Sequence, residues 1–229
     1  MSDPQRVLLV GATGLVGGRV MAVAAERADV RLVALTRREA PLPSGARMEM
    51  MVAEPARWDE AVALIGANAA ICALGTTWRK AGRDETTFRL VDEELVLRVA
   101  RAALTSGVRN FVFVSSVGAS PTAGSLYLRV KGEVENRLRK LGFHRLDILR
   151  PGLLRGQRGA DRRFAERAAI LASPLVNAVL HGERRRYRAI HASKVAEAAL
   201  QCCREKARGT FVQEHDALLR LARRFETGQ

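Results

Sequence analysis

Two side chains with complementary acid–base chemistry, Tyr127 and Lys131, stand four residues apart. The stretch 126–141 has helical periodicity, and residues four apart on a helix lie one above the other on the same face. A lysine ammonium beside a phenol lowers the proton affinity of the phenol. Tyr127 could therefore exchange a proton with a carbonyl or an alcohol. The spacing predicts a proton-transfer pair.

Two serines, Ser115 and Ser116, follow an apolar stretch at residues 110–114 that is predicted to be a strand. Ligands of open α/β sheets bind beyond the carboxyl ends of the strands. A serine hydroxyl at that place can donate a hydrogen bond to a substrate oxygen as charge develops on it. The sequence does not distinguish the two serines, so both are candidate catalytic residues.

A glycine-rich loop joins the first apolar strand, residues 6–10, to a predicted helix over residues 15–27. Its candidate cofactor-binding residues are Gly11, Thr13, Gly14, Leu15, Val16 and Gly17. The first glycine permits a tight turn, the second lets backbone N–H groups approach a pyrophosphate, and the third lets the helix pack close to the sheet. The start of the helix offers free N–H groups and a positive dipole end to phosphates. The loop therefore predicts a dinucleotide site.

The residues that follow the second predicted strand, residues 30–35, indicate which dinucleotide is bound. An NAD site usually has an acidic residue there, whereas this chain has Arg37 and Arg38. A guanidinium can bind a 2′-phosphate through two charge-assisted hydrogen bonds. We therefore expect NADP (NADPH) as the cofactor.

Apolar strands and helices alternate along the chain, which predicts an α/β fold with a doubly wound parallel sheet (Rossmann fold). Further strands are expected at residues 48–53, 69–74, 110–114 and 146–149, and a helix at 92–106. We expect a single domain, residues 1–229, with a cofactor-binding core over 1–152 and a small substrate-side lobe over 153–229. Helices at 164–180 and 194–205 and a short strand at 210–213 are predicted in that lobe.

Composition excludes several classes of protein. No apolar run is long enough for a membrane span, and no secretory signal is present, so a cytoplasmic location is expected. The net charge of +14 comes from scattered arginines, which does not indicate specific nucleic-acid binding. The three cysteines and four histidines show no metal-ligand spacing, and no metal site is predicted. Glu133 and Glu135 are expected to face solvent or to pair locally with Arg137 or Arg139.

Residues 5–155 resemble the short-chain dehydrogenase/reductase superfamily. More narrowly, they resemble its atypical NAD(P)H-binding branch with the Tat-interacting-protein-type oxidoreductases. The motifs that carry the resemblance are CALGTT at 72–77, KAG at 80–82, VSSVGA at 114–119, LYLRVKGEVE at 126–135 and RPG at 150–152. The resemblance implies that Leu74, Gly75 and Thr76 line the cofactor, and that Pro151 and Gly152 meet its nicotinamide end. Tyr127 and Lys131 would also contact the cofactor, Lys131 through the ribose.

Two functions follow from these residues. One is an NADP(H)-dependent oxidoreductase that transfers hydride between the nicotinamide and a small carbonyl or alcohol substrate. The alternative is a catalytically weak, redox-sensing regulatory protein that binds NADP(H) and presents its surface to a protein partner. The sequence identifies no substrate and leaves the oligomeric state, monomer or dimer, open.

Overall fold

The computed structural model describes residues 4–44, 48–156 and 182–228. Its centre is a seven-stranded parallel sheet in the order β3-β2-β1-β4-β5-β6-β9. The strands are β1 (Gln5–Val10), β2 (Val30–Thr36), β3 (Glu49–Val52), β4 (Ala69–Cys72), β5 (Asn110–Val114), β6 (Arg145–Leu149) and β9 (Gly209–Gln213). A second small sheet pairs β7 (Leu154–Arg155) with β8 (Ile190–His191). The strand order reverses between β1 and β4, which is the switch point where doubly wound sheets bind ligands.

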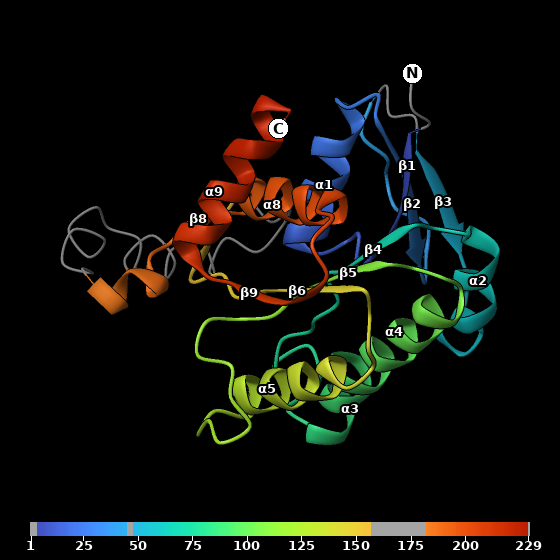
Figure 1. Cartoon of the computed structure of the whole chain (residues 1–229). Coiled ribbons are helices and arrows are strands. Elements are labelled where there is room, and N and C mark those ends of the chain that lie inside the picture. Colours follow the sequence, from blue (N-terminus) through green and yellow to red (C-terminus); the bar gives the residue numbers. More distant parts are fainter. Residues whose placement is uncertain (1–3, 45–47, 157–181, 229) are drawn as a thin grey trace.

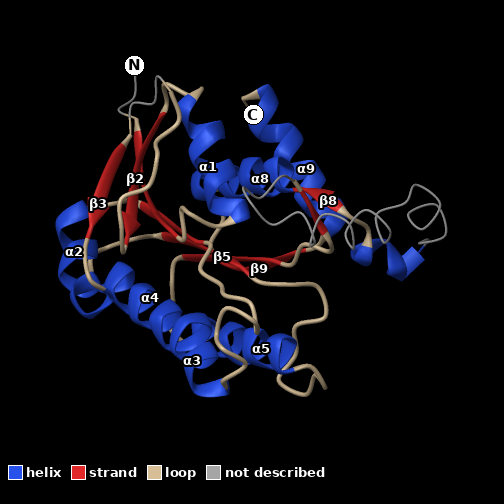
Figure 2. Ribbon diagram, turned by 180° about the vertical axis from the view of Figure 1, so that it is seen from behind, coloured by secondary structure: helices blue, strands red, loops and turns tan. Residues whose placement is uncertain are grey.

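Helices cover both faces of the sheet (Figures 1 and 2). One face carries α1 (Leu15–Ala25), α8 (Ala192–Arg204) and α9 (His215–Thr227). The other carries α2 (Trp58–Ile65), α3 (Glu85–Arg89), α4 (Leu95–Thr105) and α5 (Leu126–Arg139). One turn of π-helix, Leu90–Glu94, links α3 to α4, and short 3-10 turns lie at Pro55–Arg57 and Gly182–Tyr187.

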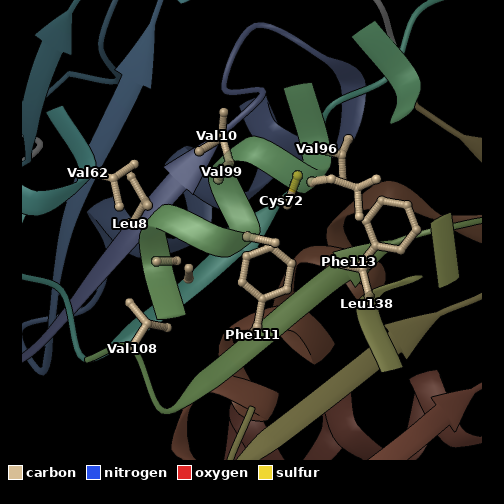
Figure 3. Packing of buried hydrophobic residues seen from close by; sticks show 14 of the residues in the cluster. Leu8, Val10, Val62, Cys72, Val96, Val99, Val108, Phe111, Phe113 and Leu138 are labelled. Carbon is tan, nitrogen blue, oxygen red and sulfur yellow. The ribbon is translucent and has the colours of Figure 1, made fainter. Parts of the chain in front are cut away.

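The buried strands divide their side chains between two apolar clusters. Leu8, Val10, Phe111 and Phe113 face the side of α2, α4 and α5 (Figure 3). Val7, Leu9 and Val112 alternate with them and face α1, α8 and α9. This two-sided burial explains why the strands lack polar alternation in sequence. It also holds the carboxyl ends of β1, β4 and β5 rigidly at one edge.

The predicted fold class, a single-domain doubly wound parallel sheet, is confirmed. The predicted helix at 92–106 is part of a longer helical run that begins at Glu85 and contains the π-turn. The part of the chain after Gly152 supplies β9 to the main sheet and α8 and α9 to its cover. The helix predicted at 164–180 lies outside the described residues. The division into a core and a substrate-side lobe stays a prediction.

Candidate active site

The glycine loop makes the tight turn expected between β1 and α1. Gly11 has a φ of +90°, and a Cβ there would lie 2.5 Å from the Ala73 carbonyl carbon, so only glycine fits. A Cβ on Gly17 would lie 2.1 Å from the Gly11 carbonyl oxygen. Gly14 is the N-cap of α1, and a Cβ there would lie 3.2 Å from the Gly11 carbonyl oxygen and 3.9 Å from the Ala73 carbonyl oxygen. The loop is therefore packed against the end of β4.

The start of α1 is open to an anion. The first helical hydrogen bond runs from the Gly18 N–H to the Gly14 carbonyl, so the preceding N–H groups, from Leu15 to Gly17, have no helical acceptor. No acidic residue lies in the first turn. Thr13 is exposed beside these groups. Free N–H groups, a positive dipole end and the absence of carboxylates fit a pyrophosphate.

Arg37 and Arg38 follow β2 directly, and both side chains are exposed. The Thr36 hydroxyl donates to the Arg38 carbonyl at 2.8 Å, which shapes the turn after the strand. Within the described ranges, neither arginine forms an ion pair with a carboxylate. The predicted contact of these arginines with the cofactor stays a prediction.

Lys131 is the buried centre of a polar network. Its side chain is 3% exposed, and its Nζ lies 3.1 Å from Asp92 Oδ1 and donates to the Leu74 carbonyl at 3.3 Å. Asp92 is fully buried within the π-turn, and its other oxygen accepts the Thr76 N–H at 2.7 Å. The predicted Leu74–Thr76 segment is therefore tied to Lys131 through Asp92.

The charge of Lys131 is maintained inside the protein. Burial lowers the pKa of Lys131, but the Asp92 carboxylate and Tyr127 favour the ammonium, so that the pKa is raised above 10.5. The Phe113 ring, 5.0 Å from Nζ, adds a cation–π contact. Gly75 is exposed, and a Cβ there would lie 3.7 Å from Nζ. A bound molecule can therefore approach the ammonium past a residue that has no side chain.

Tyr127 lies in the first turn of α5, one turn before Lys131, and is 39% exposed. Its ring packs edge-on against the buried Phe88, with 6.3 Å between the centroids. The ring is therefore positioned by the core while part of the residue reaches solvent. The structure brings together the candidate pair on one face of α5.

The two serines differ in their surroundings. Ser115 is buried, and its Oγ donates to Glu135 Oε1 at 2.6 Å. Ser116 is half-buried, and its Oγ makes a long 3.4 Å hydrogen bond to the Val117 carbonyl. Because the Ser115 hydroxyl is engaged by a buried carboxylate, Ser116 is the serine available to a ligand.

Glu135 corrects one expectation. It was expected to face solvent or to pair locally with Arg137 or Arg139. The pairing with Arg139 is confirmed, but the side chain is fully buried and does not face solvent. Arg150 binds it through two donors, at 2.9 and 2.5 Å, and Arg139 adds a third at 3.1 Å. Glu135 thereby joins α5 to the ends of β5 and β6. The spacing could have indicated this, because Tyr127, Lys131 and Glu135 succeed one another every four residues on one helix face.

Pro151 and Gly152 follow β6 at the same sheet edge. The Pro151 carbonyl accepts the Val117 N–H at 3.0 Å, which ties this segment to the loop after the serines. A Cβ on Gly152 would lie 2.5 Å from the Arg188 carbonyl oxygen. The two residues therefore form a tight crossing between β6 and the segment before β8.

Asp92 was missed as a site residue, because an acidic side chain near a predicted helix start usually only favours the helix dipole. Its position in a π-turn explains its role, since the extra residue in such a turn redirects a side chain. Neither the π-turn nor its contact with Lys131 has a recognisable sequence signature.

Fold, glycine loop and buried lysine together define a dinucleotide-binding protein. Residues 11–206 match the family model described as NAD(P)H-binding. The chain belongs to this NAD(P)H-binding family. The resemblance to the atypical branch of the short-chain dehydrogenase/reductase superfamily is thereby confirmed.

Curated relatives cover most of the chain. "Protein FMP52, mitochondrial" of Eremothecium gossypii is 41% identical over 172 residues, which are 74% of this chain and 75% of that protein. The Aspergillus clavatus protein of the same name is 36% identical over 163 residues, 68% and 69% of the two chains. These names point to mitochondria, so the expected cytoplasmic location is wrong.

Solved structures share the fold at low identity. MoeE5 in complex with UDP-glucose and NAD has a TM-score of 0.66 and 19% identity, and the match covers 93% of this chain and 75% of that one. UDP-glucose 4-epimerase of Thermotoga maritima has a TM-score of 0.70 and 15% identity, and the match covers 97% of this chain and 82% of that one.

In the described part of the chain, no helix has the length and apolarity that crossing a membrane requires.

Proposed function

We propose that the protein is an NADP(H)-dependent oxidoreductase that interconverts a carbonyl compound and its alcohol. The observation that carries the proposal is the buried Lys131 ammonium, fixed by Asp92 one helical turn from the half-exposed Tyr127. A charge this deeply buried is costly to maintain unless it is paired, and such groups cluster at functional sites. The glycine loop lies at the same sheet edge.

The chain's residues have separate roles in the proposed reduction. NADPH, when bound, supplies the hydride that reduces the carbonyl carbon, and it is left as NADP+. Tyr127 donates its hydroxyl proton to the carbonyl oxygen, which completes the alcohol. The Lys131 ammonium favours the resulting phenolate, which regains a proton from solvent. Ser116 donates a hydrogen bond that holds the substrate oxygen beside Tyr127.

The proposed preference for NADP rests on Arg37 and Arg38. They have exposed guanidinium groups directly after β2 and no carboxylate partner among the described residues. A 2′-phosphate can accept several charge-assisted hydrogen bonds from such a pair. An NAD ribose offers only hydroxyl groups at that position.

Tyr127→Phe tests the proposed chemistry. The variant keeps the ring that packs on Phe88 and removes only the hydroxyl, so NADPH affinity and melting temperature should stay within error. Turnover of a carbonyl substrate should fall by about a hundredfold or more, the usual scale of acid–base catalysis. Substrates are found by following NADPH absorbance against a panel of aldehydes and ketones.

Tyr187→Phe is the matched control. Tyr187 is the second of the two tyrosines and is 44% exposed. Its backbone, which the substitution leaves unchanged, lies against Gly152, and its ring packs against the Arg186 guanidinium at 5.2 Å. Tyr187→Phe should keep full turnover. Lys131→Met should behave differently from both, because it removes a ribose contact and leaves Asp92 unpaired, so that affinity, turnover and stability fall together. Full turnover by Tyr127→Phe would refute the mechanism, and no turnover on any carbonyl would favour a redox-sensing protein.

A further inference from the structure

Two half-exposed aromatic residues, Trp78 and Tyr127, rest on one buried ring. Phe88 is 1% exposed, and both neighbours meet it edge-on, with centroid distances of 6.2 Å for Trp78 and 6.3 Å for Tyr127. Trp78 is 43% exposed. Edge-on packing of this kind is a favourable aromatic geometry that fixes ring orientation. The core therefore supports both rings and leaves part of each open to solvent.

The backbone places Trp78 at the candidate active site. Trp78 follows Thr76 by two residues, and the Thr76 N–H is held by Asp92, the partner of Lys131. The turn beyond it is closed by a hydrogen bond of 2.9 Å from the Arg83 N–H to the Trp78 carbonyl. Arg83 has a φ of +61°, an unfavourable conformation for a side chain of its kind. The loop is thus fixed at both ends, and its tryptophan packs on Phe88, the same buried ring that supports the candidate proton donor Tyr127.

Trp78 is far more exposed than the other tryptophan of the chain. The other tryptophan, Trp58, is 2% exposed and donates its indole N–H to the Ala53 carbonyl at 2.9 Å, as an ordinary core tryptophan does. Small-molecule sites, by contrast, are lined mainly by aromatic side chains with a few polar groups that orient the ligand. Trp78 supplies the aromatic surface, and Tyr127 and Ser116 supply the polar groups.

We propose that Trp78 and Tyr127 form an aromatic wall that selects a planar, aromatic carbonyl compound as substrate. The aromatic part of the substrate packs on Trp78, while its carbonyl oxygen meets the Tyr127 hydroxyl. This inference rests on the proposed function and names the substrate class of the same site. Trp78 determines specificity and takes no part in proton transfer.

Two methyl ketones of equal carbon count test the wall: acetophenone, which is planar and aromatic, and cyclohexyl methyl ketone, which is neither. Protein labelled with 5-fluorotryptophan gives two ¹⁹F resonances, and the Trp78→Phe variant assigns them. In the presence of NADP+, acetophenone should shift the Trp78 resonance and leave the Trp58 resonance unmoved. Acetophenone should also bind at least threefold more tightly than its saturated analogue. This readout needs no turnover.

Three substitutions separate recognition from support of the core. Trp78→Leu still covers Phe88 but has no aromatic face, and it should weaken acetophenone binding by about three- to tenfold, as expected for one aromatic contact. Trp78→Phe should retain most of the affinity. Leu64→Ala, which truncates an exposed side chain on α2, is the control and should change nothing. NADPH affinity should be equal in all of them.

The wall is refuted if the two ketones bind equally, if neither shifts the Trp78 resonance, or if Trp78→Leu keeps the preference for acetophenone. Failure of the proposed function has a different signature. Acetophenone would then bind in a Trp78-dependent manner, yet no carbonyl compound would be reduced. Reduction of carbonyl compounds without any Trp78-dependent preference would leave the proposed function intact and eliminate the wall.

Discussion

Asp92→Asn should destabilise the protein strongly, although it only replaces one carboxylate oxygen with an NH2 group of similar size. The carboxylate is fully buried, lies 3.1 Å from the Lys131 ammonium and accepts the Thr76 N–H at 2.7 Å. Removing one charge of a buried pair leaves the other uncompensated, which costs about 3–5 kcal/mol. For a chain of this size the melting temperature should fall by about 6–20 °C.

The stability that Asp92→Asn loses relative to the parent protein should become smaller as the pH rises. In the parent protein the pKa of Lys131 is raised above 10.5. The Asp92–Lys131 pair therefore stabilises the folded state fully below pH 10.5, and this stabilisation is lost as the pH rises through the raised pKa. Without the Asp92 carboxylate, burial should lower the pKa of Lys131 below 10.5. The variant should then gain stability as the pH rises toward 10.5. The stability difference should therefore narrow between pH 7 and pH 10.

Urea unfolding at several pH values measures this difference. Asp59→Asn, at an exposed position on α2, is the matched control and should cost at most about 1 kcal/mol. The double variant Asp92→Leu with Lys131→Met removes both charges, so it should be more stable than Asp92→Asn. A loss below about 1 kcal/mol, or a loss that stays constant with pH, would refute the account of this pair.

Three further predictions concern other parts of the structure. Arg37→Ala with Arg38→Ala should weaken NADPH binding by about ten- to a hundredfold and NADH binding far less, and equal losses in calorimetry would exclude a 2′-phosphate contact. Ser115→Ala removes the hydrogen bond to Glu135 and should lower the free energy of unfolding by about 1.5–3 kcal/mol, whereas Ser116→Ala should lower turnover and leave stability unchanged. The opposite result would assign the catalytic role to Ser115 and the structural role to Ser116. Burial raises the pKa of all three cysteine thiols, so a thiol reagent at pH 8 should modify none of them before unfolding.

Patterns local in sequence allowed much of the fold to be predicted. The apolar strand before Gly11 and the glycine spacing up to Gly17 predict the strand–turn–helix unit, because the positive φ of Gly11 and the close approach of Gly17 to the Gly11 carbonyl are requirements of the loop itself. The four-residue spacing of Tyr127 and Lys131 likewise places them together, since helix geometry fixes that relation.

Contacts between distant segments could not be predicted in this way. Asp92 meets Lys131, and Glu135 meets Arg150 and Ser115, only because the fold brings the π-turn before α4, helix α5 and the ends of β5 and β6 together. Glu135 is therefore buried, although the sequence pattern of its own helix predicts an exposed position there.

The most direct test of the central claim follows an isotope from cofactor to product. The protein is incubated with NADPH carrying deuterium at the transferable C4 position and with a panel of aldehydes and ketones, and the alcohols are analysed by mass spectrometry. The account predicts an alcohol with one deuterium on the former carbonyl carbon, in at least hundredfold smaller yield per unit time with Tyr127→Phe and unchanged with Tyr187→Phe. NADPH binding without any deuterated alcohol, or equal yields from Tyr127→Phe, would contradict it.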